Sequence, residues 1–299
     1  MSAIVRKALS LALALALCFT FVGCAEKGEA LTQEEIDQIM ADSINATATA
    51  ETYQFDMDMS MTIDVTGGEE AVTMSMTANG TGALNNTSQE MQMIMNGTMI
   101  MGIPGQATME MSMNMEYYIV DRWAYIKVSM PGMVENWTKM ELPSEAWEMM
   151  WDSQTKIDYG QELMELLDIS FLDSESIDGV ECYVFDIGLN MTEVADYILQ
   201  LMPEMGEIGI EPEMLTNLLQ KMSISQTEWI AKDTNLMLKA DAQVLMEITP
   251  EDVGATAEDF EKITMDINIE VTIHDYNQPV SVMLPPEALN ATEIEIPMM

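Results

Sequence analysis

Four stretches in the first half of the chain alternate between apolar and polar residues, with methionine at many of the apolar positions. They are YQFDMDMSMTIDV (53–65), AVTMSMT (71–77), EMQMIMNG (90–97) and MEMSMNMEYYIV (109–120). Successive side chains of a β-strand point to opposite faces, so this alternation predicts strands with one apolar and one polar face. Because only short connections separate the four stretches, we expect an antiparallel meander.

The remaining patterns add helices and further strands. Thr32 and Glu35 form a capping box at the start of an amphipathic helix over 31–50. Helical spacing is also found over 144–151, 161–169, 191–202 and 212–222. Alternation predicts further strands over 123–130, 179–189, 227–248 (a hairpin), 263–276 and 278–284. This order predicts an α+β fold, a single domain over residues 31–299 whose large antiparallel sheet carries helices on its apolar, concave face.

The first 23 residues have the layout of an export signal. Arg6 and Lys7 precede an apolar run over 8–22, and small residues follow it. This run is shorter than the about 20 residues that a membrane-spanning helix needs. We therefore interpret residues 1–23 as a signal peptide that is absent from the folded domain.

The end of this signal, FVGC at 21–24, resembles the lipobox of envelope lipoproteins, with Phe21 in place of the usual leucine. In that family the cysteine thiol is diacylated and becomes the new N-terminus. The resemblance implies lipid attachment at Cys24, a polar tether over 24–30 and a domain held on the extracytoplasmic face of a membrane. The alternatives are an uncleaved anchor and an ordinary secretion signal.

The chain is strongly acidic, with 51 Asp and Glu against 11 Lys and Arg and a formal net charge of -40. Such a surface repels nucleic acid, whose phosphates are bound by Lys and Arg, so we expect no nucleic-acid partner. A solvated acidic coat is the simplest interpretation. Of the three cysteines, only Cys182 lies inside the domain, which leaves no intrachain disulfide framework.

Asn-x-Ser/Thr sequences are frequent. They begin at Asn45, Asn79, Asn85, Asn86, Asn96, Asn136, Asn190 and Asn290. One interpretation is N-glycosylation of an exported protein, and the other is that Asn, Gly and Thr gather in turns in any case.

No arrangement typical of an enzyme is found in the sequence. His274, the one histidine, falls on the polar side of its predicted strand, where a satisfied or solvated side chain is expected. One histidine and one internal cysteine do not suffice for a zinc site. The nucleophile elbow, the P-loop and the dinucleotide-binding fingerprint are not found. We therefore expect a non-catalytic protein without a metal or cofactor.

The methionine rows allow three interpretations. Soft thioethers bind Cu(I), but metal sites use a few ligands, and here Val, Ile, Tyr and Phe continue the rows in register. A closed core is the second interpretation, and the protein would then be a structural or interaction lipoprotein without a ligand. Methionine is adaptable and suits surfaces that bind variable apolar partners, which favours a lined cavity. The expected lining residues are Phe55, Met57, Met59, Met61, Met74, Met76, Met91, Met93, Met109, Met111, Met113, Met115, Tyr117, Trp147, Trp151, Leu201 and Leu218.

Several motifs together resemble the lipoprotein-carrier superfamily (LolA-like) and the LppX–LprG type of envelope lipoproteins. They are the lipobox, YYIVDRWAYIKV (117–128), DGVECYVFDI (178–187), TEWIAKDTNLMLKADAQV (227–244) and IHDYNQPVSVMLPPEA (273–288). The resemblance implies a half-open β-barrel whose concave face and helices enclose an apolar cavity. It also implies a membrane-anchored protein that binds or carries a lipid or another hydrophobic small molecule; the sequence identifies no protein partner.

Overall fold

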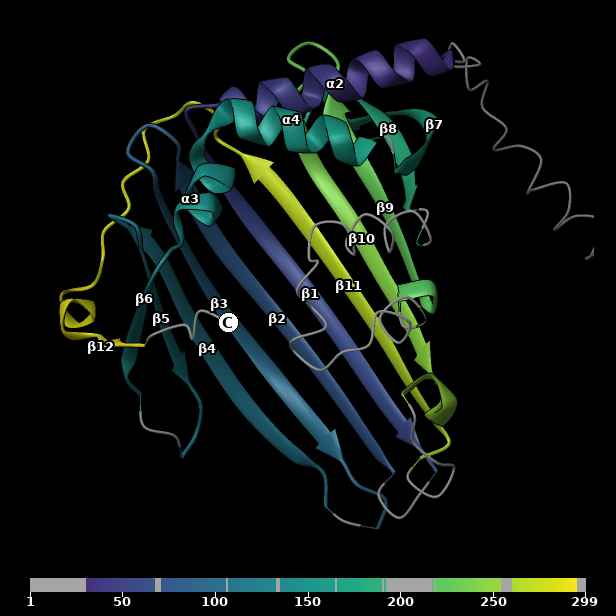
Figure 1. The fold of residues 1–299 in the computed structure, drawn as a ribbon, viewed down its shortest axis with the longest axis vertical. Helices are drawn as coiled ribbons and strands as arrows, with labels where there is room; N and C mark the ends of the chain where they lie inside the picture. Colours follow the sequence, from purple (N-terminus) through teal and green to yellow (C-terminus); the bar gives the residue numbers. More distant parts are fainter. Residues whose placement is uncertain are drawn as a thin grey trace, which may run out of the picture.

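The computed structural model describes residues 31–67, 71–105, 107–132, 135–164, 166–189, 191, 217, 219–253 and 260–294. Figure 1 shows one large sheet with helices across one end. The sheet has 12 strands in the order β12-β6-β5-β4-β3-β2-β1-β11-β10-β9-β8-β7. Its two edge strands, β12 and β7, do not pair with each other, so among the described residues the sheet is open and not a closed barrel.

Neighbouring strands are antiparallel except for β12 and β6, which pair in parallel. The strands are β1 (Thr52–Thr66), β2 (Val72–Asn85), β3 (Glu90–Gly102), β4 (Met109–Val120), β5 (Trp123–Ser129), β6 (Trp137–Glu141), β7 (Leu167–Ile177), β8 (Val180–Leu189), β9 (Met222–Ala231), β10 (Met237–Ile248), β11 (Lys262–His274) and β12 (Thr292–Glu293). The four methionine-containing stretches are therefore β1 to β4, and they form the expected meander.

Three α-helices are described: α2 (Gln33–Thr49), α3 (Ser144–Trp151) and α4 (Ser153–Met164). The predicted capping box is confirmed, because the Glu35 N–H donates to Thr32 Oγ1 at 3.3 Å and the Thr32 N–H donates to Glu35 Oε2 at 2.8 Å. Two short 3₁₀ helices, η2 (Pro250–Val253) and η3 (Pro286–Asn290), lie near the C-terminus. Among the helices that the structure describes, none is long and apolar enough to cross a membrane.

Two apolar clusters fix the helices on the sheet. In the first, Ile36 and Met40 of α2 pack against Phe185 and Ile187 of β8 and Ile230 of β9. In the second, Trp151 of α3 packs against Leu84, Ile119 and Ala124 on β2, β4 and β5. These strand residues lie on the apolar phase of the alternation, so the helices cover the apolar face at one end of the sheet.

The centre of the sheet is a seam between distant parts of the chain. β1 pairs with β2 on one side and with β11 on the other, so Gln54 lies opposite His274. The strands β2 to β6 follow one another on one side of this seam, and β10 to β7 follow one another on the other side. We call the boundary between β1 and β11 the central seam.

Three parts of the secondary structure differ from the sequence prediction. The helix expected over 161–169 ends at Met164, and β7 begins at Leu167. The strand expected over 278–284 is not formed; Val282 and Leu284 instead pack against Tyr118 and Trp137 without pairing into the sheet. The short strands β6 and β12 were not predicted. The helices expected over 191–202 and 212–222 lie largely outside the described residues.

Candidate functional site

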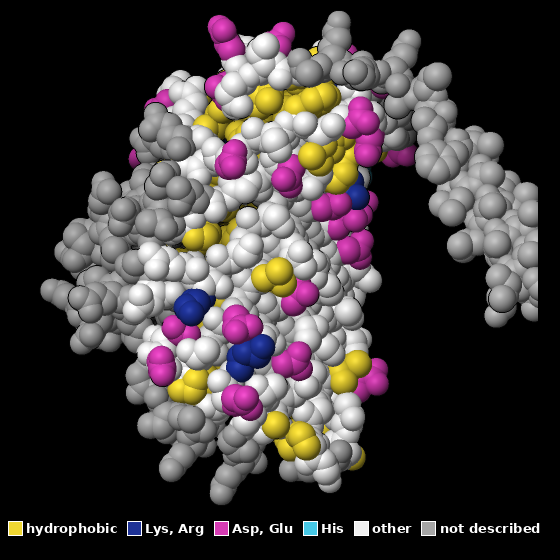
Figure 2. Space-filling model, turned by 90° about the vertical axis from the view of Figure 1, so that its right-hand side faces the viewer, with side chains coloured by type: hydrophobic (Ala, Val, Ile, Leu, Met, Phe, Trp, Pro, Cys, Tyr) yellow, Lys and Arg dark blue, Asp and Glu magenta, His cyan; other side chains and the backbone are white. Residues whose placement is uncertain are grey.

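An apolar cavity of about 460 Å³ lies under the helices, against β1, β7, β8, β9 and β10. Its walls are mostly apolar side chains with a few polar ones between them. The lining residues are Met40, Ser43, Ile44, Thr47, Ala48, Tyr53, Lys156, Gly160, Met164, Leu167, Ile187, Leu189, Gln226, Glu228 and Met237. In Figure 2, hydrophobic side chains gather towards the end of the molecule that carries α2, while Asp and Glu side chains are scattered over much of the remaining described surface.

The roof of this cavity is made where α2 and α4 approach closely. A Cβ placed on Gly160 of α4 would lie 2.9 Å from Ile44 Cγ2 of α2, so the approach leaves little room for a larger residue. The Ser153 hydroxyl donates to the Ala48 carbonyl at 3.0 Å and ties the start of α4 to the end of α2. The two helices thus form one fixed cover over the cavity.

Glu228 brings a carboxyl group into this apolar environment. It lies on β9 between Phe185 of β8 and Ala240 of β10, and the small alanine leaves space beside it. The Gln226 side-chain amide donates to Glu228 Oε1 at 2.5 Å. Burial raises the pKa of Glu228 to about 7, and the Gln226 hydrogen bond opposes this rise. Among the described residues, no basic side chain forms an ion pair with Glu228.

Lys156 of α4 is the only basic residue that lines the described cavity, and its ammonium group is already engaged. It donates to Asn86 Oδ1 at 2.9 Å, and Asn86 in turn donates to the Ala50 carbonyl at 2.6 Å. Burial lowers the pKa of Lys156, and the nearby Asp152 carboxylate opposes this. The contact therefore ties α4 to the turn between β2 and β3.

Tyrosines close the side of the cavity near β1. The rings of Tyr53 and Tyr276 are 5.7 Å apart between centroids, and the Tyr276 hydroxyl donates to the Met237 carbonyl at 2.6 Å. Burial raises the pKa of both phenols. The Thr47 hydroxyl also lines the cavity, and its proximity to Tyr276 opposes the rise in the pKa of that phenol.

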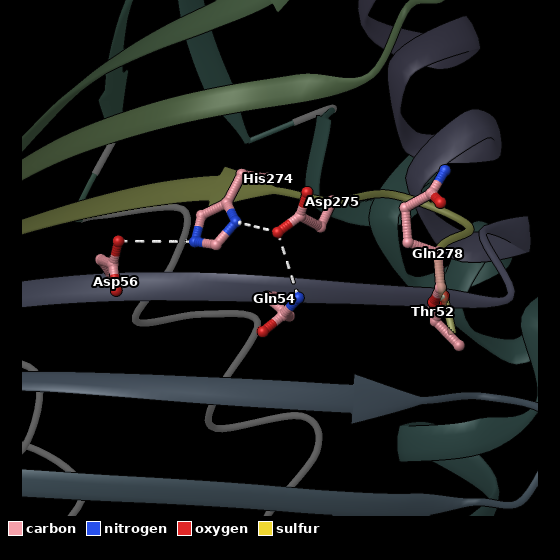
Figure 3. A network of polar contacts seen from close by, with 6 residues as sticks. All are labelled: Thr52, Gln54, Asp56, His274, Asp275 and Gln278. Carbon is pink, nitrogen blue, oxygen red and sulfur yellow. Dashed lines mark hydrogen bonds and ion pairs between the residues drawn. The ribbon is translucent and has the colours of Figure 1, made fainter. Parts of the chain in front are cut away.

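His274 lies elsewhere, on the polar face of β11 as its alternation predicted (Figure 3). Its Nδ1 is 2.9 Å from Asp275 Oδ2, and its Nε2 is 3.4 Å from Asp56 Oδ2. Gln54 Nε2 donates to the same Asp275 oxygen at 3.1 Å. These groups satisfy an exposed imidazole and place it outside the cavity. Within the described part of the chain, no group of three or more His, Cys, Asp or Glu side chains is arranged to hold a metal ion.

The predicted methionine positions do lie on one face of the sheet, opposite one another across neighbouring strands. Met61 faces Met76, and Met95 faces Met115. Met91 of β3 and Tyr117 of β4 pack in one cluster with Trp147 and Trp151 of α3. None of the predicted lining residues borders the 460 Å³ cavity. Their role in contacting a ligand stays a prediction, and Leu201 and Leu218 lie outside the described residues.

The modification sites predicted from the sequence are only partly described. Cys24 and Asn190 lie outside the described residues. Asn45, Asn79, Asn96, Asn136 and Asn290 are exposed. Asn86 instead uses its amide nitrogen to bond the Ala50 carbonyl, so a glycan there would cost this contact. Glycosylation at the other positions stays a prediction.

The sequence patterns did not single out Gln226 and Glu228 as candidate site residues, although their positions on the apolar phase of a strand could have indicated them. In MSISQTEWIA the apolar phase runs through Met222 and Ile224, and Gln226 and Glu228 continue the same phase before Ile230. Two polar residues at inward positions of a strand are exceptional, because buried polar groups need partners. The general abundance of acidic residues hid this exception.

Comparison with known proteins gives a family and distant structural relatives. A family model described as "Family of unknown function (DUF6612)" matches residues 35–293. No curated protein matches the chain. The Mycobacterium tuberculosis lipoprotein LppX is 13% identical, with a TM-score of 0.37, over 84% of this chain and 100% of LppX. LprF from Mycobacterium bovis is 14% identical, with a TM-score of 0.38, over 86% of this chain and 99% of LprF.

A DUF1329 family protein from Desulfovibrio piger is also similar, at 12% identity and a TM-score of 0.24, over 83% of this chain and 94% of that protein. The structure comparison thus returns the LppX type of lipoprotein that the sequence resemblance named.

Proposed function

The chain belongs to the family of unknown function DUF6612, and we propose that it is a non-catalytic binding protein that takes up a lipid or another apolar small molecule in the cavity under α2 and α4. The observation that supports this most directly is the cavity itself. Its volume of about 460 Å³ falls within the range of about 300–1,000 Å³ that is typical of small-molecule sites. Its walls are largely apolar with a few polar groups, which is the usual composition of such sites.

The apolar walls supply the binding free energy in this proposal. Met40, Ile44, Met164, Ile187 and Leu189 would replace water around an acyl or alkyl chain. Each CH₂ group buried in this way contributes about 0.8 kcal/mol. Met40 and Met164 are unbranched and adaptable, so the walls can follow ligands of different shape.

The same proposal includes a half-open barrel whose concave apolar face carries the helices, and an N-terminal lipid on Cys24. The lipid would hold the domain on the extracytoplasmic face of a membrane, where apolar ligands are concentrated. In cells fed a radioactive fatty acid, the full chain is expected to become labelled and a Cys24→Ser variant to stay unlabelled. Equal labelling of the two proteins would contradict the anchor and leave the cavity proposal intact.

A cavity-filling substitution tests the binding proposal. Ile44→Trp places a larger side chain under the cover formed by α2 and α4, so we expect at least a ten-fold loss of bound apolar ligand. Ile94→Trp is the matched control, because Ile94 is 37% exposed and does not line the cavity. The measurement is mass spectrometry of molecules extracted from each purified protein, together with circular dichroism to confirm folding. Equal ligand content in both variants, or none in the unmodified protein, would contradict the proposal.

A further inference from the structure

The Glu228 carboxyl group borders an apolar cavity and has no ion-pair partner among the described residues. A carboxylate removed from water is stable only when it is paired and hydrogen-bonded. In the described structure its one side-chain partner is the neutral Gln226 amide, bonded at 2.5 Å. The backbone cannot supply more, because β9 is already paired on both sides, with β8 and with β10.

Lys156 does not fill this role. It lines the same cavity, but its ammonium group donates to Asn86 Oδ1 at 2.9 Å, at the turn between β2 and β3. The other basic residues that the structure describes bind elsewhere: Lys239, for example, pairs with Asp241 and Glu270 at 3.2 and 3.1 Å. The cavity therefore offers an acceptor without a cation.

The net negative charge of the chain favours binding of a cationic ligand. With 51 acidic against 11 basic residues, the protein carries a negative field that raises the local concentration of cations and lowers that of anions. An ammonium group that reaches Glu228 would form a charge-assisted hydrogen bond in a medium of low polarity, where such bonds are strong.

We propose that the cavity takes amphiphiles with a protonated amine, placing the ammonium group against the Glu228 carboxylate and the alkyl chain against Met40, Ile44 and Leu189. The Gln226 amide holds the carboxylate in place, and the apolar walls shield the ion pair from water. This assignment of the head group rests on the proposed function, that the cavity binds apolar small molecules.

Three photoreactive probes of equal chain length test the head group: dodecylamine, dodecanol and dodecanoate, each with a diazirine at the chain end. The full chain in phosphatidylcholine nanodiscs is irradiated with each probe at pH 8, and mass spectrometry measures labelling of peptides from α2, α4 and β9. We expect dodecylamine to label these peptides at least ten-fold more in the unmodified protein than in Glu228→Gln. Dodecanol labelling should change less than two-fold.

Glu181→Gln is the matched control, since Glu181 is exposed on the neighbouring strand β8. It should leave labelling by all three probes unchanged. Equal labelling by amine and alcohol in the unmodified protein would overturn the head-group assignment while supporting the proposed function. Preferential labelling by dodecanoate would assign the head group to Lys156 instead. Absence of labelling by all three probes would overturn both proposals.

Discussion

The apolar face of the sheet differs between its helix-covered end and its methionine-rich part, although the same alternation builds both. At the helix-covered end, Phe185 and Ile230 are 0% exposed and pack against Ile36 and Met40 of α2. In the methionine-rich part, side chains such as Met61 stay half-buried, and Met109 is 49% exposed. Alternation thus sets which face is apolar, while branched and aromatic residues under a helix make that face a closed core.

The helix-covered end and the methionine-rich part also differ in the polar groups that they carry. The helix-covered end holds the cavity with the half-buried Glu228 carboxyl group, and the described methionine rows hold no carboxyl group on their apolar phase. A larger hollow of about 750 Å³ is lined mainly by polar side chains such as Asn79, Thr98 and Gln243. Among the described residues, an apolar wall beside a carboxyl group without an ion-pair partner is therefore a feature of the helix-covered end.

The largest expected effect is a difference in the free energy of unfolding that is lost when a large side chain is truncated in each of the two parts. Phe185→Ala should lower the free energy of unfolding by about 3–5 kcal/mol, because it leaves a void in a fully packed site. Met61→Ala should cost only about 1–2 kcal/mol, since its side chain is half-buried and flexible. Urea unfolding followed by circular dichroism measures both. Equal losses would show that the methionine-rich part is packed as tightly as the core.

A somewhat smaller effect concerns pH and is confined to the cavity. The folded Glu228 carboxyl keeps its proton up to about pH 7, whereas its ordinary pKa is 4.5, so the folded state binds more protons between these values. The free energy of unfolding therefore falls as the pH rises through this window, by up to about 3 kcal/mol. Urea unfolding at pH 5 and pH 8 measures this fall. In Glu228→Gln the free energy of unfolding should fall less between the two pH values than in the unmodified protein, because the glutamine does not titrate. Glu181→Gln is the control. If the free energy of unfolding of Glu228→Gln depended on pH as strongly as that of Glu181→Gln, the assignment of this pH dependence to Glu228 would be contradicted.

The smallest effect is expected in the methionine rows. Replacing Met111 and Met113 by leucine keeps volume and polarity, so the free energy of unfolding should change by less than about 1.5 kcal/mol. We also expect the same Cu(I) titration curve for the variant and the unmodified chain. Saturable tight Cu(I) binding that the double substitution weakens would instead support the soft-metal interpretation of these rows.

The strands that the sequence predicted well are those with uninterrupted alternation. The stretch MEMSMNMEYYIV is β4 from end to end, and the following turn has Asp121 and Arg122 at φ 50° and 68°, as a tight hairpin requires. β7 was missed because a register shift between Phe171 and Asp173 interrupts its alternation, and because Leu167 and Ile169 continue the spacing of α4. The strand predicted over 278–284 fails because its apolar residues pack against Trp137 from outside the sheet.

The lining of the cavity could not be predicted from the sequence for a different reason. It forms only when α2, α4 and β9 meet, and these elements come from distant parts of the chain. The methionine rows were predicted to line an apolar cavity because they dominate the apolar phase, and that role stays a prediction. The sheet residues that border the 460 Å³ cavity include Tyr53 and Leu189, at the ends of β1 and β8 beneath the helices, where length and register decide the contact.

The central seam has a consequence for how the chain reaches its native state. Each half of the sheet can assemble from neighbouring hairpins, but β1 meets β11 only after nearly the whole chain has been made, since Gln54 pairs with His274. Contacts so distant in sequence are slow to form, because the intervening chain must first be ordered. Until then β1 exposes an unpaired edge beside its apolar face, and an unprotected edge of this kind invites pairing with other chains. The newly made protein is therefore most vulnerable to aggregation just before its last long strand arrives.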